Sequence, residues 1–234
     1  MELQEFWQEL EKRIAKYDLL CHPFYRAWAA GELSAQDLRE YAGHYYHHVA
    51  AFPTYLAQLY SRLEDGKLRR AVLRNLCDEE GLDGDAKSPS HAELWLDFAV
   101  GMGADRDATR RAQPVKEVRG LVAHFRRLAS EASPAEALAA FYAYESQVPR
   151  VAREKAAGLR DRYGADARTC RYFTLHTGAD VYHSRVWKEA LSGLIEHEPE
   201  QAVQALSAAE STAQALWAAL DGIECERQRR AIAA

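Results

Sequence analysis

Residues that interrupt regular structure are scarce in this chain, which has only 13 glycines and 7 prolines among 234 residues. This scarcity excludes collagen-like and low-complexity sequence, and it disfavours an all-β protein, which needs many tight turns. No apolar run approaches the roughly 18 residues that a membrane helix requires, so we expect no membrane span. The N-terminal residues MELQEFWQELEKR lack a basic region followed by an apolar one, so we also expect no signal peptide.

Cysteines and positive charge are also sparse. The four cysteines, Cys21, Cys77, Cys170 and Cys225, are widely separated and form no CxxC pair. This pattern disfavours a disulfide framework and indicates reduced thiols in the cytoplasm. Lysine and arginine together number 30 against 35 for aspartate and glutamate, a formal charge of −5. A duplex-binding protein normally carries a basic stripe, so we expect no nucleic-acid partner.

Apolar residues, 48% of the chain, recur mostly with helical spacing. Leu3, Phe6, Leu10 and Ile14 fall three or four residues apart and so form one apolar stripe. With its breaks at glycine and proline, this pattern predicts helices over 3–17, 23–30, 35–63, 67–80, 91–100, 114–130, 134–159, 166–197 and 199–221. We therefore expect one all-α domain over residues 1–223, in which seven to eight of these helices form a bundle, followed by a frayed tail over 224–234.

The segment LHTGADVYHSRVW places His176, Asp180 and His183 on one predicted helix. Positions i, i+4 and i+7 lie within an arc of about 60°, so all three side chains face one line in the core. Helical bundles build metal sites from imidazoles and carboxylates on such an inward face. The axial span of about 10.5 Å suits two metal ions about 3.5–4 Å apart better than one ion. Alternatively, these polar residues pair with each other or line an interface.

Glu145 lies among apolar and aromatic residues in FYAYESQVPR, on a face predicted to be buried. A buried unpaired carboxylate is costly, so Glu145 needs either a metal or a cationic partner such as Arg150 or Arg153. Pro149 lacks the N–H that would bond the carbonyl of Glu145, so the helix over 134–159 should kink there. From these residues alone, both roles for the Glu145 carboxylate stay open.

Three consecutive acids, Asp78, Glu79 and Glu80, end a predicted helix before a glycine-rich loop, and His91 opens the next helix. The periodicity does not decide between Glu79 and Glu80 as the inward residue, and acidic residues at a helix end are often simply solvated. With one of these glutamates, the three segments supply three carboxylates and three imidazoles. That donor set is typical of iron or manganese centres that react with O2, and the absence of thiolates from it disfavours an iron–sulfur cluster.

A second histidine cluster, GHYYHHVAAFP, offers His44 and His48 at i and i+4, a spacing that suits metal chelation. We expect no carboxylate within a turn on that face. Hydrogen bonding or the lining of a pocket is therefore the favoured role for these histidines, for His47 and for Tyr45.

Six segments carry a resemblance to a known family: HPFYRAWAAGELS, YYHHVAAFPTYL, NLCDEE, HAELWLDFA, YESQVPRVAREK and ADVYH. From about residue 18 to 221 the chain resembles the CADD group of haem-oxygenase-like dimetal oxidases, which includes bacterial proteins that make para-aminobenzoate. It is more distantly similar to the TenA and PqqC proteins. The resemblance implies a haem-oxygenase-like bundle that binds no haem but two metal ions, either two irons or iron with manganese. The ligands that it implies are Glu79, His91, Glu145, His176, Asp180 and His183.

The resemblance also implies an activity. In this group the dimetal centre uses O2 and an external reductant to cut a tyrosine side chain from the protein's own backbone. That side chain becomes the ring of para-aminobenzoate for folate synthesis. The tyrosine corresponds to Tyr25, and the lysine that donates the amino group corresponds to Lys155. A further tyrosine near the metals corresponds to Tyr172, and the fold group implies a homodimer. Without the resemblance, all three residues would be ordinary core or surface side chains.

Two other functions are compatible with the same residues. In the first, the dimetal centre oxidises an external amine, amino acid or fatty acid. In the second, the chain is a binding protein without metal.

One departure from the family bears on the ligands, because the loop between Glu79 and His91 is longer here by the residues around DAKS. If His91 is not the matching histidine, water takes that position, since residues 49–123 contain no other histidine.

Overall fold

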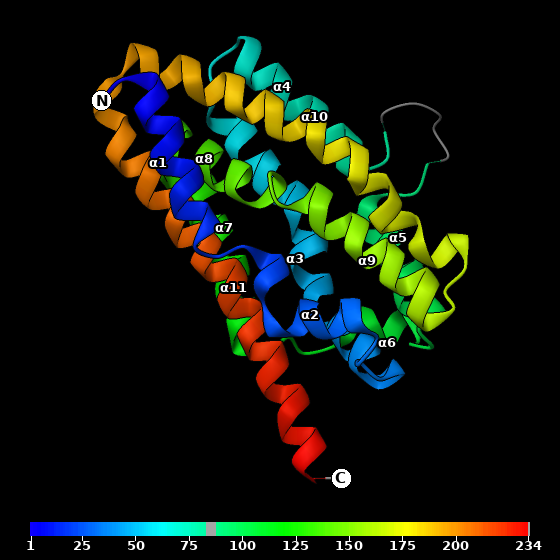
Figure 1. Cartoon of the computed structure of the whole chain (residues 1–234). Coiled ribbons are helices and arrows are strands. Elements are labelled where there is room, and N and C mark those ends of the chain that lie inside the picture. The colour runs from blue at the N-terminus through cyan, green and yellow to red at the C-terminus, as the bar shows by residue number, and fades with distance from the viewer. Residues whose placement is uncertain (83–87, 234) are drawn as a thin grey trace.

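Helices make up nearly all of the regular structure in the computed structural model, which describes residues 1–82 and 88–233 (Figure 1). Over these residues there are eleven α-helices, two short 3₁₀ helices (Leu19–Cys21 and Pro199–Gln201) and no strand. The α-helices are α1 (Leu3–Ala15), α2 (Pro23–Ala30), α3 (Ala35–Arg62), α4 (Lys67–Glu79), α5 (His91–Gly101), α6 (Arg106–Arg111), α7 (Lys116–Glu131), α8 (Pro134–Glu145), α9 (Val148–Tyr163), α10 (Ala167–His197) and α11 (Ala202–Ala233). The predicted all-α class is confirmed, with more helices than expected.

Most helix boundaries follow capping signals that the sequence contains. Ser34 and Ser133 each form a capping box, in which the serine side chain accepts a hydrogen bond from the backbone N–H three residues later. α2 begins at Pro23, whose ring suits a first helical turn, and it is followed by Gly31 with φ of +76°. These local signals explain why the sequence located most helices correctly.

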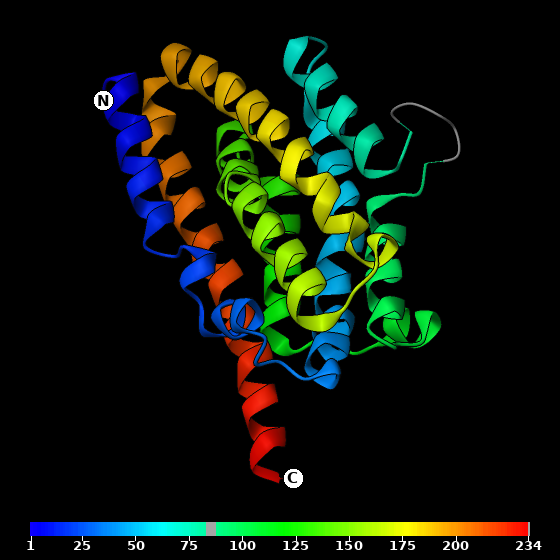
Figure 2. The ribbon, with the colours of Figure 1, turned by 45° about the vertical axis from the view of Figure 1, so that its right-hand side comes forward.

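Three long helices organise the bundle. α3 packs against α4, α5 and α7, whereas α10 packs against α5, α8 and α9, and α11 packs against α1, α7 and α8 (Figure 1; Figure 2). The core between them is rich in aromatic side chains, and the largest that are fully buried include Trp28, Trp95, Trp187, Tyr41 and Tyr55. α10 thus contacts the helices that carry most of the other predicted site residues.

The helix expected over 134–159 is two helices in the structure. α8 ends at Glu145 and α9 begins at Val148, with Pro149 in its first turn. Pro149 leaves the carbonyl of Glu145 without its usual N–H donor, and its fixed φ suits a helix start. The chain therefore breaks where a kink was expected, and Glu145 becomes the last residue of a helix.

Two further segments differ from the predictions. The short helix α6 was not predicted, although Asp105 caps it by accepting a hydrogen bond from the N–H of Ala108 at 2.7 Å. The last helix was expected to end near residue 221, but α11 continues to Ala233 and extends beyond the neighbouring helices (Figure 2). Its final turns have partners, since Arg230 pairs with Asp37 of α3 at 2.9 Å. Such a long-range contact leaves no trace in local periodicity.

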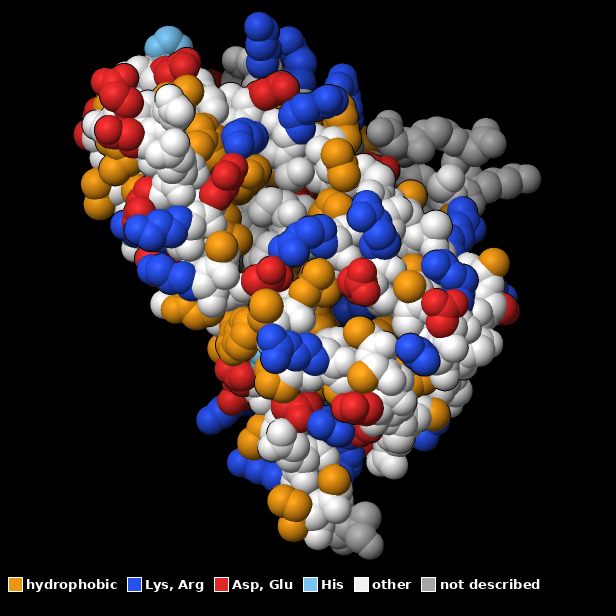
Figure 3. All heavy atoms as spheres, viewed as in Figure 1, with side chains coloured by type: hydrophobic (Ala, Val, Ile, Leu, Met, Phe, Trp, Pro, Cys, Tyr) orange, Lys and Arg blue, Asp and Glu red, His pale blue; other side chains and the backbone are white. Residues whose placement is uncertain are grey.

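The surface in the view of Figure 3 shows no segregation of charge. Lysine and arginine side chains are interspersed with aspartate and glutamate side chains over this face. Within the two described ranges, no helix combines the length and the apolar character that crossing a bilayer requires.

Candidate metal centre

α10 carries three of the six predicted ligands on one continuous α-helix. His176, Asp180 and His183 are each at most 5% exposed, as their spacing predicted. The side chains do not converge on a single point. His176 joins one group of ligand-type side chains, whereas Asp180 and His183 join another. The arrangement therefore matches the expectation of two positions along the helix.

The first group, called here the first triad, consists of Glu79, His91 and His176. Each side chain offers a ligand atom, and these atoms lie within 4.8 Å of one another. Glu79 is the last residue of α4 and His91 is the first residue of α5, so two helix ends converge on α10. The structure buries Glu79 and exposes Glu80, which resolves the choice that periodicity left open.

The second triad consists of Glu145, Asp180 and His183, whose ligand atoms also lie within 4.8 Å of one another. Glu145 is only 1% exposed and ends α8 directly before the break at Pro149. The six predicted ligands thus divide into a triad with one carboxylate and two imidazoles and a triad with two carboxylates and one imidazole.

Several buried polar atoms of the triads lack hydrogen-bond partners among the described residues. His91 Nδ1 lies 2.8 Å from Glu79 Oε2 without forming a hydrogen bond. His183 Nδ1 is 3.5 Å from Asp180 Oδ1 and is also unpaired, as is Asp180 Oδ2. Buried polar atoms without partners are costly, and lone pairs that converge without bonding are what a cation requires. The residues present therefore fit two divalent cations.

The pKa values of the second triad are shifted strongly. Burial raises the pKa of Glu145 to about 8, with smaller and opposing contributions from the charges of His183 and Asp180. Burial acts to lower the pKa of His183, but the neighbouring carboxylates of Asp180 and Asp78 raise it to about 11. A buried carboxylate thus holds a proton that an exposed one would lose. A divalent cation at this position would favour the ionised carboxylate instead.

Glu145 has neutral partners in the structure. Trp187 Nε1 donates a hydrogen bond to Glu145 Oε2, and Asn75 Nδ2 donates one to Oε1 at 3.4 Å. The alternative of an arginine partner is wrong, because Arg150 forms its ion pair elsewhere and Arg153 is exposed. The Glu145 carboxylate is therefore oriented by two neutral hydrogen-bond donors, and neither arginine neutralises it.

Tyr25 and Lys155, which are far apart in the sequence, are in direct contact. Tyr25 lies on α2 and Lys155 on α9, and each is 5% exposed. Lys155 Nζ donates a hydrogen bond to Tyr25 Oη at 2.8 Å and another to Tyr41 Oη. The same nitrogen lies 4.0 Å from the centroid of the Tyr25 ring. The residue pair implied by the resemblance is thus brought together, with Tyr41 as a third member.

Burial lowers the pKa of Lys155 well below its ordinary value, which favours the neutral amine over the ammonium form. A neutral amine has two N–H bonds and one lone pair. The two N–H bonds match the two phenol oxygens of Tyr25 and Tyr41, and the lone pair stays available. This environment suits an amine that acts as a nucleophile.

Two small cavities lie beside this pair and the triads. A cavity of about 10 Å³ is lined by members of both triads, and a second of about 30 Å³ is lined by Tyr25 and Lys155. Tyr144 and Tyr172 line both cavities. The Tyr172 ring centroid is 4.1 Å from that of His176. One layer of tyrosine rings therefore stands between the candidate metal centre and the Tyr25–Lys155 pair.

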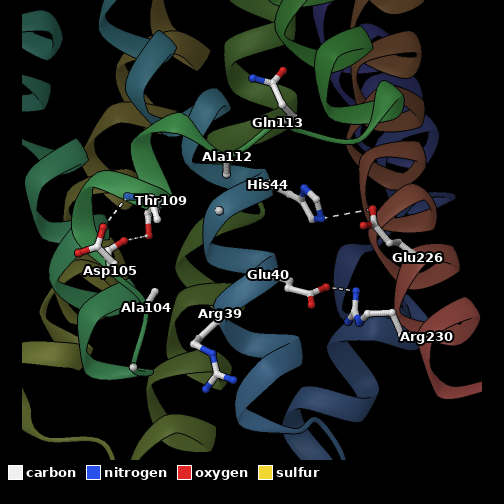
Figure 4. Close-up of a pocket in the computed structure, with 13 residues that line it drawn as sticks. Arg39, Glu40, His44, Ala104, Asp105, Thr109, Ala112, Gln113, Glu226 and Arg230 are labelled. Atoms are coloured by element: carbon white, nitrogen blue, oxygen red, sulfur yellow. Dashed lines mark hydrogen bonds and ion pairs between the residues drawn. The ribbon is translucent and has the colours of Figure 1, made fainter. Parts of the chain in front are cut away.

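The second histidine cluster does not form one site. His48 is fully buried among aromatic rings, with Phe125 and Tyr144 at centroid distances of 5.1 and 5.0 Å. Burial lowers the pKa of His48 to about 3. His44 instead lines a cavity of about 530 Å³ between α3, α6 and α11 (Figure 4). The i, i+4 spacing does not bring these two histidines to a common ligand, and His44 has the pocket-lining role that we expected.

Figure 4 shows acidic residues near His44 that we did not predict. Glu40 lies one turn earlier on α3, which corrects the expectation that no carboxylate shares this face. His44 Nε2 is also 3.4 Å from Glu226 Oε2 of α11. Arg230 already pairs with Glu40, so this cluster has a cation of its own and is a weaker metal site than either triad.

Three residues that contact the candidate site were not predicted from the sequence. Asn75 lies one turn before Glu79 on α4, and Trp187 lies one turn after His183 on α10, so helical spacing could have indicated both. Tyr41, by contrast, reaches Lys155 only through the packing of α3 against other helices, and no local signal identifies it.

Comparison with known proteins agrees with this geometry. A family described as iron-containing redox enzymes matches residues 39–217, a span that includes both triads. This chain belongs to that family. Its relatives include the 4-aminobenzoate synthase of Chlamydia pneumoniae, 39% identical over 212 residues that cover 90% of this chain and 92% of the relative. The 4-aminobenzoate synthase of Nitrosomonas europaea is 36% identical over 234 residues, 95% of this chain and 92% of the relative.

The fold is shared with a solved structure from Shewanella denitrificans, described as a domain of unknown function with a haem-oxygenase-like fold. The two superpose with a TM-score of 0.81 at 17% sequence identity, covering 97% of this chain and 94% of the other. The haem-oxygenase-like bundle is therefore confirmed for this member of the iron-containing redox enzymes. The longer loop around DAKS lies mostly outside the described residues, and the ligand and catalytic roles remain predictions.

Proposed function

We propose that this chain forms 4-aminobenzoate, the para-aminobenzoate of folate synthesis, in an oxygen-dependent reaction that consumes the side chain of Tyr25. The observation that carries the proposal is the contact of 2.8 Å between Lys155 Nζ and Tyr25 Oη, one tyrosine layer away from two triads of metal-ligating residues. An amine and an aromatic ring, which the product combines with a carboxylate, are thus held side by side. The names of the two relatives described above support the same product.

Glu79, His91 and His176 would hold one metal ion, and Glu145, Asp180 and His183 would hold the other. When bound, two irons, or iron with manganese, would supply O2 activation with electrons from an external reductant. The protein's own residues position the reacting groups. Burial favours the neutral form of Lys155, and its hydrogen bonds fix the amine against the phenols of Tyr25 and Tyr41.

The size of the cavity favours a substrate that belongs to the chain itself. The cavity beside Tyr25 measures about 30 Å³, which is room for about one water molecule. Pockets for separate small molecules measure about 300–1,000 Å³. An external amino acid or fatty acid would require the aromatic walls to move, whereas Tyr25 already occupies the position.

Complementation of a para-aminobenzoate auxotroph tests this function. The wild-type gene should restore growth, whereas Tyr25→Phe and Glu145→Ala should not. Tyr55→Phe is the matched control, because Tyr55 is fully buried and its hydroxyl has no hydrogen-bond partner among the described residues. Growth with Tyr25→Phe would eliminate the self-consuming reaction and favour an external substrate.

Intact-mass spectrometry gives a second, direct readout. After exposure to iron, a reductant and O2, the purified wild-type protein should lose the mass of a side chain, and peptide mapping should place the loss at Tyr25. The Lys155→Met variant should either retain the Tyr25 side chain or release a product without the amino group. An unchanged mass together with measurable product would contradict the proposal.

A further inference from the structure

We propose that Asp78 is a positioning residue for the second metal, acting through His183. This inference rests on the proposed dimetal centre and extends it to a residue outside the six predicted ligands. Asp78 immediately precedes Glu79 at the end of α4. One helix end would therefore supply a ligand to the first triad and an orienting carboxylate to the second.

The two ring nitrogens of His183 have different surroundings. Nε2 lies 3.0 Å from Asp78 Oδ2, a hydrogen-bond distance, whereas Nδ1 lies 3.5 Å from Asp180 Oδ1 and forms no hydrogen bond. When Nε2 carries a proton and donates it to Asp78, the lone pair of a neutral imidazole resides on Nδ1. That lone pair faces the carboxylates of the second triad. The geometry thus assigns Nδ1 as the metal-binding atom of His183.

His176 in the first triad also has one ring nitrogen at hydrogen-bond distance from an acceptor outside the triad, but its acceptor is different. Its Nδ1 lies 2.7 Å from the backbone carbonyl of Tyr172, which leaves Nε2 for a metal. Each of these α10 histidines is therefore oriented by a hydrogen bond on the nitrogen that does not face its triad. A carbonyl is neutral, whereas Asp78 is a carboxylate, so Asp78 also increases the basicity of the imidazole that it orients.

The location of Asp78 suits a supporting role better than a ligand role. Its side chain is 27% exposed, whereas the His183 side chain is 6% exposed, so Asp78 stands on the solvent side of the ring. Asp78 is not among the residues whose ligand atoms meet in either triad. Partners of this kind typically change metal affinity by about 10–100-fold when they are removed.

Titration of the metal-free, full-length protein with Co²⁺, followed by calorimetry and by the visible spectrum, tests the inference. Wild type should bind two Co²⁺ ions. Asp78→Ala should weaken one site by about 10–100-fold and leave the other unchanged, and Asp78→Asn should fall between, because an amide oxygen still accepts a hydrogen bond but carries no charge. Glu80→Gln, an exposed neighbour on the same helix end, should match wild type.

A double variant separates positioning from a general structural role. In the His183→Ala background, where the first triad alone binds strongly, Asp78→Ala should cause no further loss of Co²⁺ affinity. Equal weakening of both sites, or wild-type affinities in Asp78→Ala, would overturn the inference while leaving the dimetal centre in place. A wild-type protein that binds fewer than two Co²⁺ ions would overturn the proposed function and this inference together.

Discussion

Two buried polar regions of this helical core, the triads and the surroundings of Lys155, differ in the ionisable groups that they contain. The triads gather six ionisable side chains, in which imidazoles oppose carboxylates and several donor atoms stay unpaired. Lys155, one tyrosine layer away, sits instead among aromatic rings and phenols, and burial lowers its pKa. The comparison indicates that the fold gathers carboxylates and imidazoles where cations would bind and surrounds the amine with neutral aromatic side chains.

The largest expected effect comes from breaking a triad. Asp180→Ala should reduce the bound metal from two ions per chain to one and abolish 4-aminobenzoate formation, because the second triad loses one of its two carboxylates. Elemental analysis of the iron-loaded protein measures the metal content. Asp65→Ala is the control, since its side chain is 78% exposed. Two ions per chain in Asp180→Ala would remove Asp180 from the metal centre.

A second prediction concerns the lysine side of the comparison and the pH dependence of stability. Lys155 has a lowered pKa in the folded protein and an ordinary lysine pKa near 10.4 in the unfolded chain. At pH values between these two, Lys155 is protonated only in the unfolded chain. The unfolding free energy of wild type should therefore rise with pH, by up to about 1.4 kcal/mol per pH unit relative to Lys155→Met. Other groups titrate in both proteins and cancel in the difference.

Urea denaturation from pH 7 to pH 10 measures that difference. Lys155→Met should be the more stable protein at pH 7, and its advantage should shrink as the pH rises. Lys116→Met, at a side chain that is 82% exposed, should show no such trend. A constant difference between wild type and Lys155→Met across the pH range would mean that the buried amine keeps its charge.

A smaller effect is expected from the hydrogen bond that orients Glu145. Trp187→Phe removes the N–H that bonds Glu145 Oε2 and leaves a buried acceptor unpaired. The metal-free protein should lose about 1–3 kcal/mol of unfolding free energy, measured by urea denaturation. Trp217→Phe, at a half-buried ring, should cost less. An equal loss in the two variants would show that the Glu145 contact adds nothing to stability.

Local signals predicted the fold class and part of the site. Helical spacing placed His176, Asp180 and His183 on one buried face, and the apolar neighbours of Glu145 indicated its burial. Helical spacing did not predict whether Glu79 or Glu80 points into the core, because either residue can do so at the end of a helix. Tertiary packing alone resolves that choice.

Contacts between distant segments were the part that the sequence did not reveal. Tyr41 meets Lys155 across 114 residues, and Arg230 meets Asp37 across 193 residues, so neither pairing affects local periodicity. The final turns of α11 were expected to fray for the same reason. The Tyr25–Lys155 pair itself came from family resemblance, since each residue alone looks like an ordinary side chain.

Anomalous X-ray diffraction at the iron edge, from crystals loaded anaerobically with Fe²⁺, tests the central claim most directly. The account predicts two anomalous peaks inside the bundle, one enclosed by Glu79, His91 and His176 and the other by Glu145, Asp180 and His183. No peak within either triad, or a peak only beside His44 and Glu226, would contradict it.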